Sequence, residues 1–432
     1  MDAGSTRWKA VTQTQYPWER EALDFVRERL PDHDPYLAWA NFEFVAEDGS
    51  VNEVDLLVLT PKGFFLVEIK SRPGTVTGDL QSWVWKNPDG VWTADNPFLL
   101  ANRKAKRLKS LLQRQLGNRE DLPFLRAVVF LSAEKIDVQL APEARRDVAI
   151  RDRGQGTDES APRGTSGIAG IVQVLKAPDP ADLARGRGVV VDRVVAKSVA
   201  RAVHRAGIES GQRHRRVNDY RLGALLGEGR GWQDFLAEHA TLRSLKRRIR
   251  LYTVALGGSA EIRDTIARAA RREFEILRGA EHPGILRALE YASHDVGPAL
   301  IFDHPEKAQR LDHFLSEHVG RLGIDARLSI LRQLTEALRY AHGRRVFHRA
   351  LGPSSVLVCD PAVDPPEVRI FNWQTATREL VSSGSQSVIG TVHLDRLVEP
   401  AEEAYMAPEA LTAPDEGAEA LDVFSLGALA YH

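Results

Sequence analysis

Two acidic residues and a lysine in the first third of the chain could carry out metal-assisted chemistry. Asp55 lies in the apolar run VDLLVL, and Glu68 and Lys70 lie in FFLVEIK. Side chains alternate between the two faces of a strand, so Glu68 and Lys70 point the same way. Two neighbouring carboxylates attract a hard cation such as Mg²⁺ or Mn²⁺. A lysine beside such an ion can stabilise charge on a phosphate, so the three residues predict phosphodiester hydrolysis.

Whether Asp55 meets Glu68 depends on the turn between the two strands. The segment TPKG at residues 60–63 carries typical turn residues. A two- or four-residue loop places Asp55 opposite Glu68, with Cβ atoms about 5 Å apart. A three-residue loop with a bulge at Gly63 moves Asp55 to the other face of the sheet. The sequence leaves both registers open.

The expected elements around these residues alternate between helix and strand. Apolar residues at helical spacing predict helices over residues 17–30, 99–116 and 191–206. Strands are expected in 51–72 as a hairpin, in LQSWVW, over 124–132 and in GIVQVL, with a glycine-rich loop over 151–170. This order predicts a mixed sheet flanked by helices.

The second of these helices is strongly basic. Residues 101–119 carry seven basic side chains and no acidic one. Beside a metal site, such a helix would contact phosphates without sequence preference. We therefore expect contacts to DNA from four of these side chains: Arg103, Lys104, Lys106 and Arg107. The alternative is a solvated basic face, with Leu108, Leu111 and Leu112 turned to the core.

The motifs of the first 145 residues resemble those of a nuclease family. E-V-D (53–55) and E-I-K (68–70) resemble the PD-(D/E)xK pattern, and with P-W-E (17–19) and D-N-P (95–97) the segment resembles a nuclease-related (NERD) domain. The resemblance implies a restriction-endonuclease-like mixed sheet with flanking helices. It implies that Asp55 and Glu68 hold Mg²⁺ or Mn²⁺ and that Lys70 assists hydrolysis. Glu19 would supply a further ligand or a base.

The second half of the chain resembles a protein kinase. Six segments follow one another in the order of kinase landmarks: YRLGALLGEGRGWQDFLAEH, REFEILRGAEHPGIL, RYAHGRRVFHRALGPSSVLV, VRIFNW, YMAPEAL and DVFSLG. They imply a bilobal kinase-like domain over residues 218–432 with an incomplete C-lobe. The chain stops inside an apolar helical pattern without a C-cap signal, so we expect a fragment of a longer protein.

Three positions that carry phosphoryl transfer differ from the kinase pattern. The catalytic-loop triplet is His348-Arg349-Ala350, and Ala350 cannot accept the proton of a substrate hydroxyl. Ser355 stands where kinases have a metal-binding asparagine, and Asn372 stands where they have the D-F-G aspartate. An amide is a weaker Mg²⁺ ligand than a carboxylate.

The nucleotide-binding positions are also altered. The segment RRIRLYTVAL contains no lysine, and Arg250 is the nearest cation to the ATP-pairing position. Trp232 replaces the third glycine of the phosphate loop, whereas Glu273 matches the glutamate of the αC helix. These departures predict a pseudokinase. Gly227 and Gly229 leave nucleotide binding open, without transfer.

Composition sets the remaining limits. The 432 residues suffice for two or three domains, and the formal net charge of −1 means that DNA contact must come from a local patch. One cysteine, Cys359, excludes a disulfide framework. No apolar run of membrane length and no signal peptide are present, so we expect a cytoplasmic protein without membrane partners. The expected division is a flexible tail (1–15), a NERD core (16–145), a connecting segment (146–217) and the kinase-like domain.

The combination of a NERD domain with a kinase-like domain resembles bacterial phage-defence proteins of the phage-growth-limitation (BREX-type) group. The resemblance implies a role in phage defence, with other defence proteins as partners and an active kinase module beyond residue 432. The leading hypothesis is a Mg²⁺-dependent nuclease domain acting on DNA, regulated by or tethered through a pseudokinase. The alternatives are a non-catalytic DNA-binding and docking scaffold, and an active serine/threonine kinase of unusual design.

Overall fold

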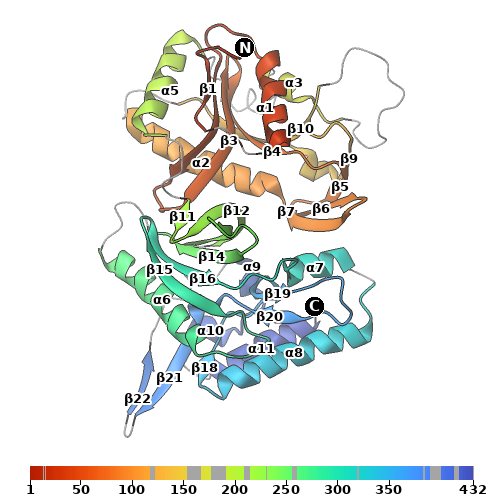
Figure 1. Cartoon of the computed structure of the whole chain (residues 1–432), viewed down its shortest axis with the longest axis vertical. Helices are drawn as coiled ribbons and strands as arrows, with labels where there is room; N and C mark the ends of the chain where they lie inside the picture. Colours follow the sequence, from red (N-terminus) through yellow and green to blue (C-terminus); the bar gives the residue numbers. More distant parts are fainter. Residues whose placement is uncertain are drawn as a thin grey trace. The chain divides into compact units, whose positions relative to one another are not determined.

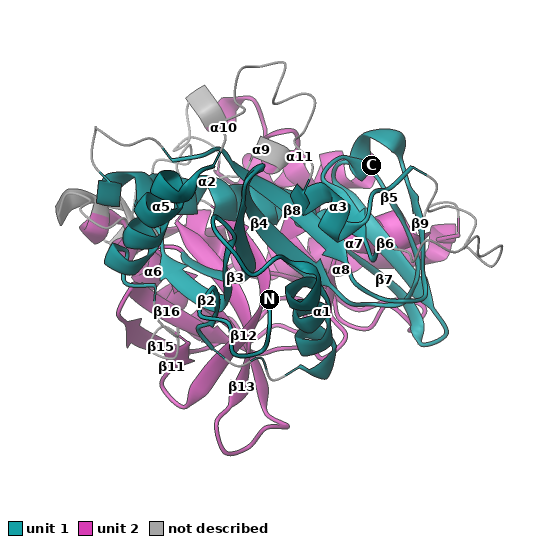
Figure 2. Cartoon of the chain, turned by 90° about the horizontal axis from the view of Figure 1, so that it is seen from above, with its two compact units in different colours: residues 1–47, 51–211 teal, residues 48–50, 212–432 magenta. Residues whose placement is uncertain are grey.

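The computed structural model describes residues 1–12, 14, 16–116, 122–152, 167–176, 191–208, 215–229, 231–254, 260–318, 321–382, 385–389, 400–412 and 418–431. The chain forms two compact units (Figure 2): unit 1 comprises residues 1–47 and 51–211, and unit 2 comprises 48–50 and 212–432. Both are mixed α/β structures, as the sequence predicted. Among these described residues, no helix is long and apolar enough to cross a bilayer.

Unit 1 is built on a six-stranded mixed sheet. Its strands, in spatial order, are β1 (Trp8–Ala10), β2 (Leu37–Val45), β3 (Val51–Thr60), β4 (Gly63–Lys70), β8 (Leu125–Leu131) and β10 (Val148–Ile150). Strands β2, β3 and β4 are antiparallel neighbours, whereas β8 is parallel to both β4 and β10. The two central strands, β3 and β4, are those that carry Asp55, Glu68 and Lys70.

The prediction of a flexible tail over residues 1–15 is wrong for its central part. Residues 8–10 form β1, which runs parallel to β2. The amino group of Met1 also donates a hydrogen bond of 2.8 Å to the carbonyl oxygen of Arg27. Backbone pairing at the sheet edge and this terminal contact hold a segment whose composition gave no sign of order.

Helices cover both faces of the unit 1 sheet (Figure 1). Helices α1 (Pro17–Arg29) and α3 (Ile171–Lys176) lie on one face, and α2 (Pro97–Leu116) and α5 (Arg193–Arg205) lie on the other. Each helix turns an apolar stripe to the sheet, because apolar residues recur at helical spacing. The α2 and α5 face buries Leu57, Leu66, Leu108 and Val199, and the α1 and α3 face buries Val26, Val67, Phe130 and Ile171.

A smaller sheet completes unit 1. Its spatial order is β7 (Gly90–Asp95), β6 (Ser82–Asn87), β5 (Gly74–Gly78) and β9 (Ile136–Leu140), and a short 3₁₀ turn, η1 (Pro142–Arg145), follows β9. Strand β6 matches the strand expected in LQSWVW. The residues that it buries, Trp83 and Trp85, pack with Val76 and Val138, so these two tryptophans belong to the core.

The segment GIVQVL forms helix α3, so the predicted strand is wrong. The carboxylate of Asp152 accepts hydrogen bonds from the backbone N–H groups of Val172 (2.8 Å) and Gln173 (3.1 Å). These bonds satisfy donors of the first helical turn and favour a negative charge there. Most of the predicted loop, residues 153–166, lies outside the described residues.

Unit 2 begins with a second six-stranded sheet. Its spatial order is β11 (Arg216–Val217), β12 (Tyr220–Gly229), β13 (Trp232–His239), β14 (Lys246–Tyr252), β16 (Gly297–Phe302) and β15 (Ala288–His294). Helix α6 (Ala260–Arg278) packs against this sheet (Figure 1). The arrangement is the first lobe expected for a kinase-like domain.

The second lobe of unit 2 is mainly helical. It contains α7 (Leu311–His318), α8 (Ile324–His342), α9 (Pro400–Glu403), α10 (Glu409–Thr412) and α11 (Ala418–Tyr431). This lobe also contains two small three-stranded sheets. The first consists of β17 (Gln309–Arg310), β19 (Val356–Val358) and β20 (Val368–Ile370), and the second consists of β18 (Val346–Phe347), β21 (Thr377–Ser382) and β22 (Ser385–Ile389). A short 3₁₀ turn, η2 (Pro353–Ser355), precedes β19, and another, η3 (Trp373–Thr375), follows β20.

Candidate functional site

The turn between β3 and β4 settles the register that the sequence left open. Thr60 pairs with Gly63 and Leu56 pairs with Val67, so the loop contains only Pro61 and Lys62. This is the two-residue register, and no bulge forms at Gly63. The pairing ends at Leu56 and Val67, and Asp55 and Glu68 are the next residues along the two strands.

Asp55 and Glu68 are electrostatic neighbours. The Asp55 Oδ2 atom accepts a hydrogen bond of 2.7 Å from the backbone N–H of Ile69, the residue after Glu68. Burial, followed by the negative charge of Glu68, raises the pKa of the Asp55 carboxyl well above its usual range. Ionising Asp55 beside Glu68 is therefore unfavourable, because two neighbouring carboxylates repel each other.

Glu68 is held by two lysines. Its Oε1 atom accepts from Lys70 Nζ at 2.9 Å, and its Oε2 atom accepts from Lys104 Nζ at 2.7 Å. Burial alone would raise the pKa of Glu68, but the charges of Lys104 and Lys70 outweigh it and lower this pKa to about 2. Glu68 is therefore ionised throughout the physiological range.

Lys104 does not lie where the sequence reading placed it. We expected it on an exposed DNA-binding face, but its side chain is only 8% exposed and reaches Glu68 from α2. The signal was present in the helical spacing, since Lys104 falls on the stripe defined by Ala101, Ala105 and Leu108, all buried. The proposed DNA contact through Lys104 is therefore replaced by a contact within the site.

The other basic residues of α2 are divided between two sides of the helix. Arg103 and Lys106 are exposed, and Arg107 is half-buried and donates a hydrogen bond of 3.2 Å to Asn52 Oδ1. Successive residues of a helix are rotated by about 100°, so Arg107 and Arg103 lie on one side of Lys104, about 60° and 100° from it, and Lys106 lies about 160° away. Residues 117–119 of the basic stretch lie outside the described residues.

Glu19 lies at the start of α1. It is half-buried, and its Oε2 atom accepts a hydrogen bond of 2.7 Å from Thr14 Oγ1. Glu21 of the same helix pairs with Arg151 at 2.6 Å. A role for Glu19 as a further ligand or base stays a prediction.

The residues around Asp55 fit a Mg²⁺ or Mn²⁺ ion with few protein ligands. Within the described parts of the chain, no group of three or more His, Cys, Asp or Glu side chains could hold a metal. Mg²⁺ commonly uses one or two carboxylates and keeps several waters, so a pair is sufficient. Asp55 and Glu68 would be that pair, with Lys70 and Lys104 beside them.

In unit 2, the residues that match kinase scaffold positions make the corresponding contacts. The Asp422 carboxylate of α11 accepts from the backbone N–H groups of His348 (2.8 Å) and Arg349 (2.6 Å). His348 Nε2 lies 2.9 Å from the Phe371 carbonyl oxygen, and Glu273 of α6 pairs with Arg250 at 3.3 Å. These contacts hold the catalytic-loop segment and the helix in kinase-like positions.

The residues at the catalytic and metal-binding positions carry no negative charge. Ala350 packs in an apolar cluster with Met406, Ala407, Ala410 and Leu421. The Ser355 hydroxyl donates to Glu402 Oε1 at 2.9 Å. The Asn372 side-chain oxygen accepts a hydrogen bond from the Arg250 guanidinium, so it faces a positive charge and does not suit a Mg²⁺ ion.

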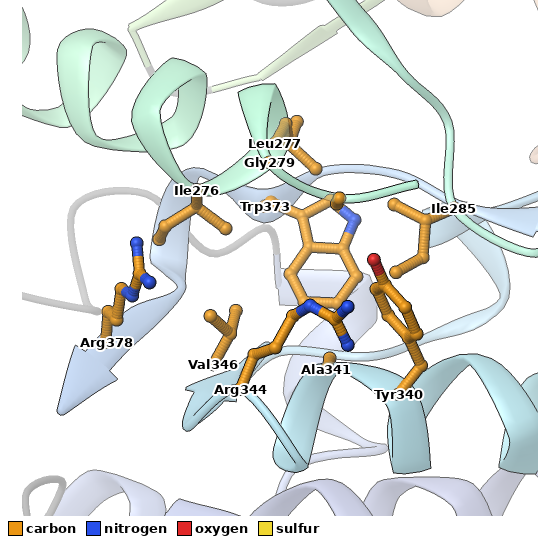
Figure 3. Close-up of a pocket in the computed structure, with 11 residues that line it drawn as sticks. Ile276, Leu277, Gly279, Ile285, Tyr340, Ala341, Arg344, Val346, Trp373 and Arg378 are labelled. Atoms are coloured by element: carbon orange, nitrogen blue, oxygen red, sulfur yellow. The ribbon is translucent and has the colours of Figure 1, made fainter. Parts of the chain in front are cut away.

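A cavity of about 140 Å³ lies elsewhere in unit 2 (Figure 3). It is lined mainly by apolar side chains of α6 and α8 and by Trp373, with Arg344 and Arg378 at its edge. Neither glycine of the predicted phosphate loop, Gly227 or Gly229, is among its lining residues. The cavity is therefore not the position at which a kinase holds a nucleotide.

The matched pair Lys104 and Lys106 tests the buried contact to Glu68. Replacing Lys104 with methionine should lower the free energy of unfolding by about 2–3 kcal/mol, because it removes one partner of a buried charge. Lys106→Met should change it by less than about 0.5 kcal/mol, since Lys106 is exposed. Urea unfolding followed by tryptophan fluorescence measures both, because most tryptophans lie in unit 1.

The pH dependence separates the ion pair from simple packing. The lowered pKa of Glu68 stabilises the fold fully above the ordinary value of 4.5, and this stabilisation is lost as the pH falls toward about 2. The difference between parent and Lys104→Met should therefore be smaller at pH 3 than at pH 7. An equal difference at both pH values would contradict the ion pair.

Comparison with known proteins identifies both units. Residues 14–132 match the nuclease-related domain (NERD) family, and residues 253–432 match the protein kinase domain family. Over 98% of its length the chain is 34% identical to the probable kinase PglW of Streptomyces coelicolor, of which it spans 27%. Over 52% of its length it is 24% identical to Aurora kinase B of Danio rerio, covering 63% of that protein. Over 38% of its length it is 28% identical to the serine/threonine-protein kinase dkf-1 of Caenorhabditis elegans, covering 21% of that protein. The chain therefore joins a nuclease-related domain to a protein kinase domain, the combination that its motifs indicated.

Proposed function

We propose that unit 1 is a Mg²⁺-dependent nuclease-type domain acting on DNA. The observation that carries the proposal is that Asp55, Glu68 and Lys70 meet just beyond the paired part of β3 and β4. Asp55 Oδ2 accepts a hydrogen bond of 2.7 Å from the Ile69 N–H, and Lys70 Nζ bonds to Glu68 at 2.9 Å. The negative charge of Glu68 contributes to the raised pKa of Asp55, so the two carboxyl groups lie near each other, and a divalent cation beside them would offset this repulsion.

In this proposal the two carboxylates act together, and the two lysines that contact Glu68 have different roles. Asp55 and Glu68 would hold the ion, which when bound would polarise a phosphoryl oxygen and activate water. Lys70 is 38% exposed, so its ammonium group can reach from Glu68 toward a phosphate and stabilise the charge that develops there. Lys104 is buried, and it would position Glu68 and keep it ionised.

The partner of unit 1 would be DNA, bound through its phosphates. Arg103 and Arg107 lie closer around α2 to Lys104 than Lys106 does, so they could contact a backbone whose scissile phosphate lies at the carboxylate pair. Contacts of this type contribute affinity without sequence preference. The near-zero net charge of the chain makes such a local patch necessary.

Unit 2 would act as a regulatory or tethering module without phosphoryl transfer. Ala350, Ser355 and Asn372 replace the proton acceptor and the metal ligands, and transfer requires these groups to neutralise charge. By similarity to PglW and to the phage-growth-limitation group, the biological setting would be phage defence, with other defence proteins as partners. The name of that relative supports an active kinase instead, so the transfer test below decides between the two.

A cleavage assay tests the nuclease proposal. The 432-residue chain, supplied with Mg²⁺ or Mn²⁺ and varied DNA, should cleave. Asp55→Ala should abolish cleavage and weaken metal binding measured by calorimetry. Lys70→Ala should lower the rate by about 10²–10³ and leave metal binding nearly unchanged, because its role is on the transition state. Lys62→Ala in the β3–β4 turn is the matched control and should cleave normally.

The pH profile of metal binding sharpens this assay. Because the pKa of Asp55 is raised, a proton competes with the ion, and affinity should fall as the pH decreases through that raised pKa. Cleavage that persists in both Asp55→Ala and Lys70→Ala would reject the proposed site. DNA binding by the parent without any cleavage would favour the scaffold alternative.

Salt dependence tests the DNA contacts of α2. Changing Arg103 and Arg107 together to glutamine should reduce the slope of log affinity against log salt by about two units, roughly one for each lost phosphate contact. Lys106→Gln should leave the slope nearly unchanged, since this residue points away from the sheet. An equal loss from both changes would mean that the whole exposed face of α2 binds DNA, and no loss from either would place DNA elsewhere.

A radiolabelled-ATP assay tests the absence of phosphoryl transfer. Neither the parent chain nor the double change Ala350→Asp with Asn372→Asp should label itself or a generic substrate. The added carboxylate at Ala350 would enter an apolar cluster, and Arg250 still replaces the lysine. Clear autophosphorylation by the parent, abolished by Gly229→Trp, would establish the active-kinase alternative.

A further inference from the structure

The cleft of unit 2 contains a fully paired network of charged side chains. Its centre is Arg250 of β14, which is 1% exposed. Arg250 Nε and Nη2 donate to the Asp234 carboxylate at 2.7 and 2.9 Å, and Nη1 donates to Glu273 at 3.3 Å. Nη1 also donates to Gln374 at 2.9 Å, and Nη2 donates to Asn372. A guanidinium has five N–H groups, and all of them are used.

A second arginine fills the space beside this centre. Arg248 is 6% exposed, and it donates to Asp234 Oδ2 from Nε at 2.8 Å and from Nη2 at 2.7 Å. Its guanidinium carbon lies 4.5 Å from the centre of the Phe371 ring, which belongs to the other lobe. The Arg248 side chain therefore extends from the sheet to the segment that follows β20, and its guanidinium contacts both Asp234 and Phe371.

Trp232 closes the same space from the side of the glycine strand. Its ring packs so closely on Gly229 that a Cβ atom there would lie 2.5 Å from the indole. The Arg250 guanidinium carbon lies 4.2 Å from the centre of the ring. The indole therefore contacts both the backbone and a cation, and it takes the place of a third phosphate-loop glycine.

The positions of these residues explain why the network matters for ATP. In the kinase pattern, G-x-G-x-x-G-x-V ends on a valine, and V-A-I-K supplies a small alanine and the phosphate-pairing lysine. Counted from Gly227, this chain has Asp234 at the valine position, and R-R-I-R places Arg248 at the alanine and Arg250 at the lysine. Two small apolar residues of the nucleotide site have become a buried ion pair.

We infer that unit 2 does not bind ATP, because the paired side chains of Asp234, Arg248 and Arg250, together with the ring of Trp232, fill the nucleotide cleft. A nucleotide would have to displace buried arginines from their carboxylates and would find no free donor on Arg250 for its phosphates. The inference goes beyond the absence of transfer, because a pseudokinase that lacks only its catalytic groups can still hold ATP. The kinase fold would serve here as a permanently closed scaffold.

Equilibrium dialysis with labelled ATP tests the inference on the 432-residue chain, with Mg²⁺ and with chelator. The parent should show no saturable binding at millimolar ATP. Saturable binding that survives Asp55→Ala, which removes the metal site of unit 1, would overturn the inference. ATP binding without transfer would contradict this inference but not the proposal that unit 2 lacks phosphoryl transfer, so a failure of one can be told from a failure of the other.

Two variants test whether the network is the cause. Arg248→Ala removes the bridging side chain, while Asp234 keeps its bonds to Arg250. The triple change Asp234→Val, Arg248→Ala and Arg250→Lys restores the kinase residue types. At least one of them, with its fold verified by circular dichroism, should bind ATP at least about tenfold more tightly than the parent limit. Arg247→Ala, the neighbouring half-exposed arginine of β14, is the control and should gain nothing. Folded variants that still fail to bind would show that the network is not the barrier.

Discussion

A buried charge must have a partner, because an unpaired one costs more free energy than a domain can spare, and both units are arranged around this constraint. In unit 1, Glu68 is balanced by Lys70 and Lys104, whose charges also act on the adjacent Asp55. In unit 2, the charges of Asp234 and Glu273 are balanced by two arginines, and every N–H group of Arg250 is in use. The two clusters differ in that the first contains a carboxyl group whose pKa is raised, which the proposed metal ion would exploit, whereas Arg250 in the second has no N–H group to spare.

Much of this could be predicted from local sequence. The periodicity of apolar residues located α1, α2 and α5, and the kinase-like motifs located the second domain in order. The hairpin register depended on the number of residues in one turn. The two-residue loop of Pro61 and Lys62 pairs Leu56 with Val67 and so brings Asp55 and Glu68 to the same end of the paired segment. Lys104 was assigned to the wrong surface because the charge of the segment was given more weight than its helical spacing.

The remaining errors share a physical cause, since they depend on partners distant in sequence. The first N–H groups of helix α3 donate to the carboxylate of Asp152, which lies 20 residues before Val172 in the chain. The β-branched residues of GIVQVL, taken alone, favour a strand. Strand β1 is ordered by pairing with β2, which follows after the whole of α1. The network around Arg250 joins Asp234, Glu273 and Asn372, and no short motif contains any two of its members.

The saturation of Arg250 also limits how this kinase fold can change over generations. Replacing Arg250 alone leaves Asp234 with Arg248 as its one remaining partner in this network. Replacing Asp234 alone leaves two guanidinium groups buried together without the carboxylate that they share. Either of these two single changes therefore gives a less stable protein, although the combined change restores an apolar pocket. If unit 2 has lost nucleotide binding, as we infer, regaining it would require several coordinated substitutions.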